Sequence, residues 1–569
     1  MLDNLNRRQL LTSGGATTVA LLAGCGGQQG DGGSDGGSSD GSGSDGGSSD
    51  GSGSDGTNTN EPGEQVGTQT MEVGQLTYFP DLGQQMKQQW GELGVDFEVE
   101  TSTWGSFVTR IYVDNKFTDS TLSPWGSSPD RIDPNFHLST YSSDSSLNIS
   151  GYSNEEYDKA FQNQKTAFDE EERNEYIKQC QTILREDLPE IVINWPKATL
   201  PVNSSKWNIK PTKFIGARTT GTMTVLTAEP TGDTQRLVVG AQQELTTPNP
   251  LAPGSNDVQY LFKMAYDTPR RVGLDGTAQN WAVEEFENVD DSTIDMTLRE
   301  GMKWHDGEDV TVDDLKFTFD FFTEYSFPKY DPYVSSVEST SIQTDRTLRV
   351  SLKEPNVAFL TSAMTFMNIL PKHIWESVPD KVDQPVNYNM PVDEMVASGP
   401  LKITDKTTDE LQMEKFDDHF HDLPYEEFVF VNRASTEAIR AGFVEQNIHM
   451  TTSSPSPSVT NELAKKDYIK KSVAPSVLQM KFSFDLSTKP WNDPAFRRAL
   501  LAATDAKKIS QLFFNGAANE ADGTIIHPEQ KWGRNDLESV GSADVEKAKS
   551  ILRDAGYTYD NNGNLHYPS

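Results

Sequence analysis

A strand–helix–strand pattern near residue 70 restricts the possible folds of this chain more than any other feature. Residues 71–80, MEVGQLTYFP, alternate weakly between apolar and polar side chains and predict a strand. The following residues carry apolar side chains at helical spacing, Gly94 ends the predicted helix, and VDFEVE alternates again as a second strand. Strands connected by a helix pair in parallel, so the sequence predicts an α/β fold.

The first 25 residues predict an export signal. NRRQLL contains the arginine pair Arg7 and Arg8, and the apolar run ATTVALLAG follows at residues 16–24. This run is too short to span a membrane as a mature helix, and the arginine pair indicates the twin-arginine export route. The run leads into LLAGC, which resembles a lipoprotein cleavage site where Cys25 becomes a lipid-modified N-terminus. An ordinary cleaved signal with a chance cysteine is the alternative.

Residues 26–69 predict a disordered tether between that signal and the folded part. Gly, Ser and Asp dominate the segment, and SDGGSSDGSG is repeated in tandem. A flexible coil of this length has an r.m.s. reach of about 35 Å. A lipid anchor and a tether together would place the protein at the extracellular face of the cytoplasmic membrane.

The acidic composition predicts a haloarchaeal source. The formal net charge is −36, from 85 acidic and 49 basic residues, while 10 Trp, 17 Tyr and 27 Phe indicate packed cores rather than disorder. An acidic, hydrated surface stays soluble in high salt because ions screen its self-repulsion. The same charge repels phosphates and argues against a nucleic-acid partner. With Cys25 lipidated, Cys180 has no disulfide partner, and we interpret it as a core residue.

Motifs of catalysis are missing from the sequence. It contains no P-loop, GxSxG, HExxH or paired-cysteine zinc pattern, so we expect neither an enzyme nor a cofactor. The segment DDHFHD carries His419 and His421, whose spacing could serve a metal ion. We interpret this segment as a solvated loop of an acidic protein and predict no metal site.

Three segments resemble a known family. They are LREGMKWHDGEDVTVDDLKFTFD at residues 298–320, FDLSTKPWNDPAFRRALLAATDAKKI at 484–509, and VASGPLKI at 396–403. These segments resemble the extracellular solute-binding proteins of family 5, the peptide, nickel and oligosaccharide class that supplies ABC importers. The resemblance covers residues 237–569. It implies a two-lobed, type II periplasmic-binding-protein-like fold of the large peptide-binder subclass, with an extra subdomain.

The segment order resembles a circular permutation of that family. The family's second half should follow AKSILRDAGY near the chain end, but its pattern lies at residues 69–226, for example in NISGYSNEEYDKA and RNEYIKQCQTILREDLPEIVINW. The linker TAEPTGDTQR, residues 227–236, would join the original ends. We therefore expect residues 565–567 on the same lobe as residues 71–79, close to a new break between Ser569 and about Thr68. A truncated chain with an unrelated N-terminal domain is the alternative.

The resemblance also implies domain boundaries and a function. The expected boundaries are 70–195 plus 485–569 for a C-terminal-type lobe, 196–254 plus 395–484 for an N-terminal-type lobe, and 255–394 for the extra subdomain. The lobes of a monomer would close over a di- or oligopeptide and present it to ABC permease and ATPase subunits. The alternatives are the same fold binding an oligosaccharide or a nickel chelate, and a surface lipoprotein without a transport role.

Acidic residues are the first candidates for ligand contacts. PWGSSPD resembles the family loop whose acid binds the α-amino group of a peptide, so Asp130 or Asp133 would accept charge-assisted hydrogen bonds. Asp133 directly precedes Pro134 and could instead brace a turn. Glu244, in QQELTTPNP, matches an acidic position facing the cleft, or it is one more surface acid of a halophile.

Aromatic and strand residues complete the expected site. Trp104 and Trp125 could floor the pocket by stacking on the ligand, or they could serve as core anchors. The resemblance places Ser398 and Gly399 on a strand crossing between the lobes. It places Gln479, in VLQMKF, where a strand edge meets the ligand.

Overall fold

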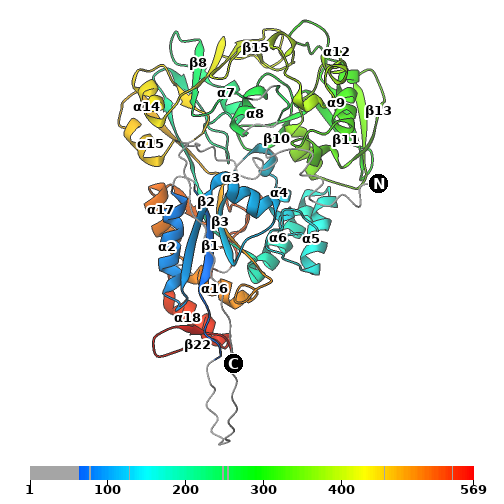
Figure 1. The fold of residues 1–569 in the computed structure, drawn as a ribbon. Coiled ribbons are helices and arrows are strands. Elements are labelled where there is room, and N and C mark those ends of the chain that lie inside the picture. The colour runs from blue at the N-terminus through cyan, green and yellow to red at the C-terminus, as the bar shows by residue number, and fades with distance from the viewer. Residues whose placement is uncertain are drawn as a thin grey trace, which may run out of the picture.

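The computed structural model describes most of the chain after residue 62 as two stacked lobes (Figure 1). The described residues are 63–75, 78–126, 128–246, 249–252, 256–453, 455–537, 539–540 and 543–569. Arg7, Arg8, Cys25 and most of the expected tether lie outside them. We call residues 63–196 and 479–569 the lower lobe and residues 198–474 the upper lobe. Within the described part, no helix is long and apolar enough to cross a membrane.

The lower lobe is built on a six-stranded mixed sheet. Its strand order is β2-β1-β3-β20-β4-β21. The strands are β1 (Gln69–Gln75), β2 (Phe97–Thr103), β3 (Ser120–Trp125), β4 (Glu190–Pro196), β20 (Gln479–Phe484) and β21 (Ala518–Glu520). β1 pairs in parallel with both β2 and β3, which confirms the predicted strand–helix–strand unit, whereas β20 runs antiparallel to β3 and β4.

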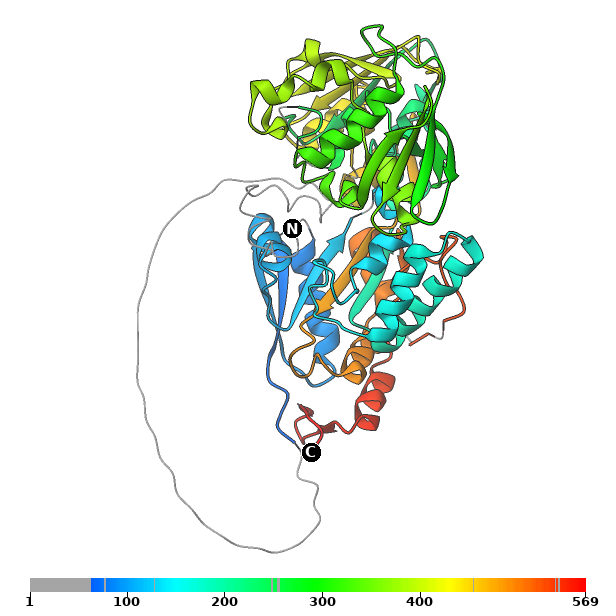
Figure 2. The ribbon, with the colours of Figure 1, turned by 90° about the vertical axis from the view of Figure 1, so that its right-hand side faces the viewer.

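Helices cover both faces of this sheet (Figures 1 and 2). They include α2 (Phe79–Gly91), α5 (Glu155–Thr166), α6 (Glu170–Asp187), α16 (Pro494–Ala503) and α17 (Ala506–Phe514). Helix α18 (Val545–Asp554) packs against α16 below the sheet. Gly94 has φ +78° after α2, as expected of a helix stop. The segment GYSNEEYDKA at residues 151–160 predicts Ser153 as the N-cap of α5, and this prediction is wrong. The cap is Asn154, whose side-chain oxygen accepts the amides of Glu156 and Tyr157.

The two largest sheets of the upper lobe share one apolar core. The first, in the order β15-β16-β17-β8-β18, joins β8 (Arg236–Ala241), β15 (Leu401–Lys406), β16 (Glu410–Lys415), β17 (Glu427–Asn432) and β18 (Met450–Thr451). The second is antiparallel and joins β11 (Val283–Asn288), β12 (Thr293–Leu298), β13 (Val337–Ile342) and β14 (Thr347–Leu352). We call the second sheet, its covering helix α9 (Val312–Glu324) and the following loops to residue 394 the extra subdomain. Side chains of both sheets belong to one continuous cluster, so the extra subdomain shares the core of the upper lobe.

The segment VTVDDLKFTF predicts a helix capped near Thr311, and α9 begins there. Thr311 and Asp314 form a capping box, in which Asp314 also accepts the Thr311 amide at 2.9 Å. Other upper-lobe helices are α8 (Asn256–Phe262), α14 (Thr436–Val444) and α15 (Pro457–Leu463).

Two strands cross between the lobes. β4 of the lower sheet continues through Lys197 into β5 (Ala198–Asn203), which pairs antiparallel with β19 (Ile469–Ala474) of the upper lobe. β19 then leads into β20, which lies in the lower sheet although the expected boundary grouped residues 395–484 with the other lobe. Connections of this kind permit a hinge motion because a few residues between the paired segments absorb the rotation.

The two ends of the described chain lie side by side beneath the lower lobe (Figure 1). A C-terminal hairpin is formed by β22 (Thr558–Tyr559) and β23 (Leu565–His566). The amide of Tyr567 donates to the carbonyl oxygen of Glu64 at 2.9 Å, and Gln65 bridges His566. The prediction that residues 565–567 lie on the same lobe as the first strand, near the expected break, is therefore confirmed.

Candidate functional site

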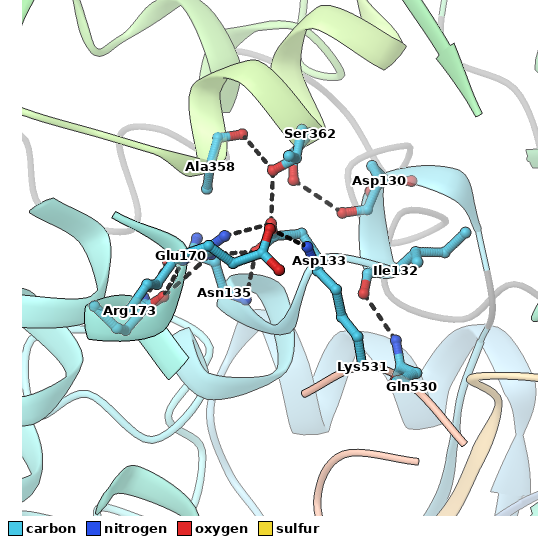
Figure 3. A network of polar contacts seen from close by, with 12 residues as sticks. Asp130, Ile132, Asp133, Asn135, Glu170, Arg173, Ala358, Ser362, Gln530 and Lys531 are labelled. Atoms are coloured by element: carbon cyan, nitrogen blue, oxygen red, sulfur yellow. Dashed lines mark hydrogen bonds and ion pairs between the residues drawn. The ribbon is translucent and has the colours of Figure 1, made fainter. Parts of the chain in front are cut away.

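The interface between the two lobes holds the candidate site. On the lower lobe it comprises the short helices η3 (Pro129–Arg131) and α4 (Pro134–Ser139), which follow strand β3. On the upper lobe it comprises the end of α8 and the helical turn η4 (Phe359–Ala363) of the extra subdomain. Figure 3 shows Asp130 and Asp133 beneath Ala358 and Ser362 of the facing lobe.

Asp130 is buried and accepts hydrogen bonds from both lobes. Within its own lobe, the Ser128 hydroxyl donates to Oδ1. From the upper lobe, the Tyr333 hydroxyl donates to Oδ2 at 3.0 Å and the Tyr260 hydroxyl approaches Oδ1 at 3.4 Å. Ser362 also donates to the Asp130 carbonyl oxygen at 3.1 Å. The carboxylate thus faces the opposite lobe, as a group that binds a ligand between the lobes must.

The Asp133 carboxylate is fully engaged by protein groups, most of them in its own lobe. It forms a two-point ion pair with Arg173 of α6 at 2.7 and 3.0 Å, and it caps α4 by accepting the Asn135 amide at 2.9 Å. The Thr361 hydroxyl of the extra subdomain donates to Asp133 Oδ2 at 2.6 Å. Burial opposes ionisation, but Arg173 with these hydrogen bonds outweighs it and holds the pKa of Asp133 below its ordinary value. These contacts give Asp133 the turn-bracing role that the sequence also allowed, and a link between the lobes.

Trp125 and Gln479 are cross-strand neighbours at the end of the lower sheet. Trp125 is 1% exposed and stacks on Phe136 with ring centroids 5.7 Å apart, while the Lys481 ammonium lies 4.4 Å from its ring. Gln479 donates to the carbonyl oxygen of Ile525 at 2.7 Å. Both side chains are buried in the lower lobe close to the candidate site.

The other expected site residues lie elsewhere. Trp104 begins α3 (Trp104–Val108) and stacks half-buried on Phe107, with ring centroids 5.4 Å apart. Glu244 is exposed on the upper lobe. Ser398 and Gly399 are inside that lobe, where the Gly399 amide donates to the Ala265 carbonyl oxygen at 2.6 Å. Across the described residues, no hydrogen bond or ion pair connects these four residues to Asp130 or Asp133.

The segment around His419 is a loop with exposed acids, as the sequence suggested, but His419 itself is not solvated. His419 is buried, and its Nε2 lies 3.2 Å from Oδ1 of the buried Asp267. It also lines a cavity of ≈ 130 Å³ together with Ser398 and Lys303. The ring of Trp281 also packs against His419, with centroids 6.0 Å apart and the ring planes tilted by 32°. In the residues that the structure describes, no group of three or more His, Cys, Asp or Glu side chains could hold a metal ion.

Sequence reasoning missed the basic residues of the interface. Lys263 and Arg271 are both buried and line a cavity that Pro129 of the lower lobe also lines. The sequence did contain a sign of this, because Lys263 interrupts the apolar run YLFKMAY. A lysine within a buried apolar run is costly unless its ammonium group finds hydrogen-bond partners.

Comparison with known proteins assigns the family. The model described as "Bacterial extracellular solute-binding proteins, family 5 Middle" matches residues 277–568, about half of the chain. This chain belongs to family 5 of the extracellular solute-binding proteins. The family consists of binding proteins rather than enzymes.

Relatives of this solute-binding protein match it over part of their length. The dipeptide-binding protein of Escherichia coli (strain K12) is 24% identical over 314 residues, which are 50% of this chain and 55% of that protein. The oligopeptide-binding protein AppA of Bacillus subtilis (strain 168) is 26% identical over 351 residues, which are 58% of this chain and 60% of AppA. The chain therefore spans less than two thirds of the length of these relatives.

Solved structures of similar proteins match this solute-binding protein to a similar extent. AppA of Bacillus subtilis in complex with a nonapeptide gives a TM-score of 0.42 at 22% identity, covering 58% of this chain and 65% of that one. NikA of Brucella suis in complex with Fe(III)-EDTA gives 0.46 at 17% identity, covering 59% and 67%.

Proposed function

We propose that this chain is the lipid-anchored, extracellular solute-binding component of an ABC importer, and that it captures a di- or oligopeptide between its lobes. The observation that carries the proposal is Asp130, a buried carboxylate at the lobe interface that accepts hydroxyl hydrogen bonds from the opposite lobe. An ammonium group forms stronger, charge-assisted hydrogen bonds to a carboxylate than a hydroxyl does. The α-amino group of a peptide would therefore replace Tyr260 and Tyr333 on Asp130.

Hinge motion about the crossing strands would admit the ligand. Opening separates η3 from η4 and exposes Asp130, and closure buries the ligand and creates a surface that permease subunits can recognise. The contacts of Thr361 and Ser362 with the lower lobe would stabilise the closed state. Binding and release of this kind need no covalent chemistry.

A peptide is the ligand that the relatives favour. Dipeptides, oligopeptides and glutathione appear in the names of the matching proteins. Oligosaccharide and nickel-chelate binding are the alternatives within the same family. A thermal unfolding screen of the protein in high salt, with peptides, oligosaccharides and nickel complexes, separates them because a ligand raises the unfolding midpoint of the state it binds. Stabilisation by oligosaccharides alone would contradict the peptide assignment.

Asp130→Asn is the direct test of the peptide site. Removal of the charge should weaken peptide binding by about tenfold to a hundredfold, because a hydrogen bond to a charged group contributes about 1.5–3 kcal/mol. Glu244→Gln is a matched control, since it removes one acidic charge at an exposed position of the upper lobe. Equal peptide affinities for Asp130→Asn and Glu244→Gln would contradict the assignment.

We also infer that the chain is a circular permutation of the family order. Strands β20 and β21 from the last part of the chain flank β4 from the first part in the lower sheet, and Glu64 lies beside Tyr567, which supports this inference. A reordered gene that starts at Asp233 and links Ser569 to Gly63 by a short Gly/Ser segment tests it. We expect the reordered protein to fold and to bind the same ligand. A reordered protein that does not fold would support the alternative of an unrelated N-terminal domain.

Residues 1–62 supply the proposed export and anchoring. Arg7 and Arg8 would direct the twin-arginine route, and Cys25 would carry the lipid. Expression in a haloarchaeal host tests both steps. Cys25→Ser should move the protein from the membrane fraction to the medium, and replacement of Arg7 and Arg8 by lysine should keep it inside the cell. Membrane association of Cys25→Ser would contradict the lipid anchor.

A further inference from the structure

The cavity beside His419 lies within the upper lobe, apart from the interface between the lobes. It has a volume of ≈ 130 Å³, which is room for several water molecules or a small organic ligand. Its walls are residues 300–303, which follow strand β12, residues 418–420 of the loop after β16, and Ser398. All of these residues belong to the upper lobe, so separation of the lobes would leave the cavity intact.

Ser398 contributes a buried hydroxyl group to this wall. The residue is 1% exposed, and its Oγ has no hydrogen-bond partner within the described part of the chain. The backbone on both sides is fixed, because the Ala397 carbonyl oxygen accepts the His305 amide at 2.7 Å and the Gly399 carbonyl oxygen lies 2.8 Å from His305 Nε2. Buried hydroxyl groups in proteins are rarely left without a partner. Ser398 therefore offers a contact that a bound molecule can complete.

The charges around the cavity favour a cation. Glu300 and Asp418 line it and are exposed, and Glu300 reaches its partner Arg346 only at 3.8 Å. The one basic lining residue, Lys303, is paired with Asp309 at 2.5 Å. The hydrogen bond to Asp309, together with the charges of Asp309 and Asp418, raises the pKa of Lys303 above its ordinary value. The charge of Lys303 is thus already balanced, and the acids that remain make the cavity attractive to a positive ligand.

The aromatic lining indicates which kind of cation fits. Phe420 lines the cavity, and its ring already packs against a cation, since the Arg299 guanidinium carbon lies 4.4 Å from the ring centroid. His419 offers no free nitrogen, because Nδ1 accepts the His421 amide at 2.9 Å and Nε2 lies 3.2 Å from Asp267 Oδ1. Metal ions such as Ca²⁺ need a shell of six or more oxygen atoms. One hydroxyl, two carboxylates and a ring suit an organic ammonium ion better.

We propose that this cavity is a second binding site of the protein, and that it takes the ammonium group of a small organic amine. The ammonium would donate hydrogen bonds to Ser398 Oγ and to the Asp418 carboxylate, and the carbon atoms of the amine would pack against Phe420. The site lies outside the peptide cleft and goes beyond the proposed function. A bound amine would connect residues 300–303 to residues 418–420 and so stabilise the upper lobe in either state of the hinge.

Thermal unfolding of the full chain in three chloride salts tests the site. The cations are methylammonium, potassium, and tetraethylammonium, which has no N–H donor, all at the same concentration. Methylammonium should raise the unfolding temperature of the wild type by several degrees relative to the other two, and the rise should saturate with concentration. An equal rise with potassium would indicate an alkali-metal site and overturn the proposal. No rise with methylammonium would mean that the cavity holds only water, and it would overturn the proposal as well.

Three variants assign the response to the cavity. Ser398→Ala should weaken methylammonium binding by about tenfold or more, as expected for loss of a hydrogen bond from a charged donor. Without amine it should unfold at the wild-type temperature or higher, because an unpaired buried hydroxyl has been removed. Asp418→Asn should also weaken the response, whereas Asp345→Asn, at an exposed position between β13 and β14, should retain it. Equal responses of the wild type and all three variants would place the amine elsewhere and overturn the site.

Discussion

The backbone amide of Val66 donates a hydrogen bond of 2.8 Å to the carbonyl oxygen of Leu565. Leu565 in turn donates its own amide to the carbonyl oxygen of Gly94 at 2.8 Å, and both Val66 and Leu565 are buried in the core of the lower lobe. Residue Leu565 thus packs in the same apolar core as strand β1, and its hydrogen bond to Gly94 attaches the C-terminal hairpin to the turn after α2.

The turn at Gly94 should tolerate no side chain. A Cβ there would lie 2.1 Å from the Gly563 carbonyl oxygen, and φ is +78°. We therefore expect Gly94→Ala to lower the free energy of unfolding by about 1–3 kcal/mol, measured by denaturant titration. Gly91→Ala is the matched control, because it lies in α2 with open space around the added methyl group and should have little effect or stabilise. Equal stabilities of the two variants would contradict the described contact between the hairpin and this turn.

The hydrogen bond from Thr361 to Asp133 should help to hold the lobes together. It joins the extra subdomain to the lower lobe at 2.6 Å, and its acceptor is charged. Thr361→Val should therefore increase the radius of gyration of the ligand-free protein in small-angle X-ray scattering. Thr166→Val, at an exposed position of α5, should leave the radius unchanged. An unchanged radius for Thr361→Val would show that this bond does not determine lobe closure.

The buried pair of Lys481 and Glu190 should be costly to break. The two side chains meet at 2.6 Å within the lower sheet, and Tyr141 and Ser483 also donate to the Glu190 carboxylate. Lys481→Met leaves the acid buried without its cation, so we expect a loss of about 3–5 kcal/mol in the free energy of unfolding.

The double variant Glu190→Gln with Lys481→Met tests this reasoning. It removes both charges and should be more stable than Lys481→Met alone, as denaturant titration of both proteins will show. Lys470→Met, at an exposed position of β19, is the control for loss of a surface lysine. If the double variant loses as much unfolding free energy as Lys481→Met and Glu190→Gln lose together when measured singly, the two side chains are not coupled.

Stability should fall in acid because His449 is buried in its neutral form. Its Nδ1 accepts the Val238 amide at 3.0 Å, and burial, with the charge of Lys206, lowers the pKa of His449 to about 4. The unfolded chain takes up this proton near pH 6.5, so the contribution of His449 is complete above that pH and is lost as the pH falls toward 4.

Replacement by asparagine isolates that contribution. The difference in unfolding free energy between wild type and His449→Asn should be constant above pH 7. Between pH 6.5 and 4 it should change in favour of the variant, by at most about 3 kcal/mol. Parallel stability curves over this range would contradict a buried neutral histidine.

Local patterns predicted much of the fold because local interactions determine those parts. The strand–helix–strand unit, the stop at Gly94 and the cap at Thr311 follow from periodicity, backbone freedom and capping chemistry. Ser153 and Asn154 are adjacent and both are good caps, so the pattern could not distinguish them, and hydrogen-bond geometry decided in favour of Asn154.

The candidate site was harder to predict because its partners are distant in the sequence. The loop containing Asp130 was identified, but Tyr260 and Tyr333, which bind it, come from another lobe. A buried lysine such as Lys263 is unfavourable in isolation, and its place depends on acceptors in the segment around Phe366. Such features depend on tertiary packing, which a single sequence does not show.

The common core of the extra subdomain and the upper lobe limits the ways in which this molecule can move. One apolar cluster runs through both sheets, so rotation of the extra subdomain alone would have to break that core. We therefore expect any rotation between the lobes to occur at the two crossing strands. A fluorophore on the outer face of β13 would report the angle of the whole upper lobe, and distance measurements from there to α18 would follow the rotation between the lobes on one coordinate.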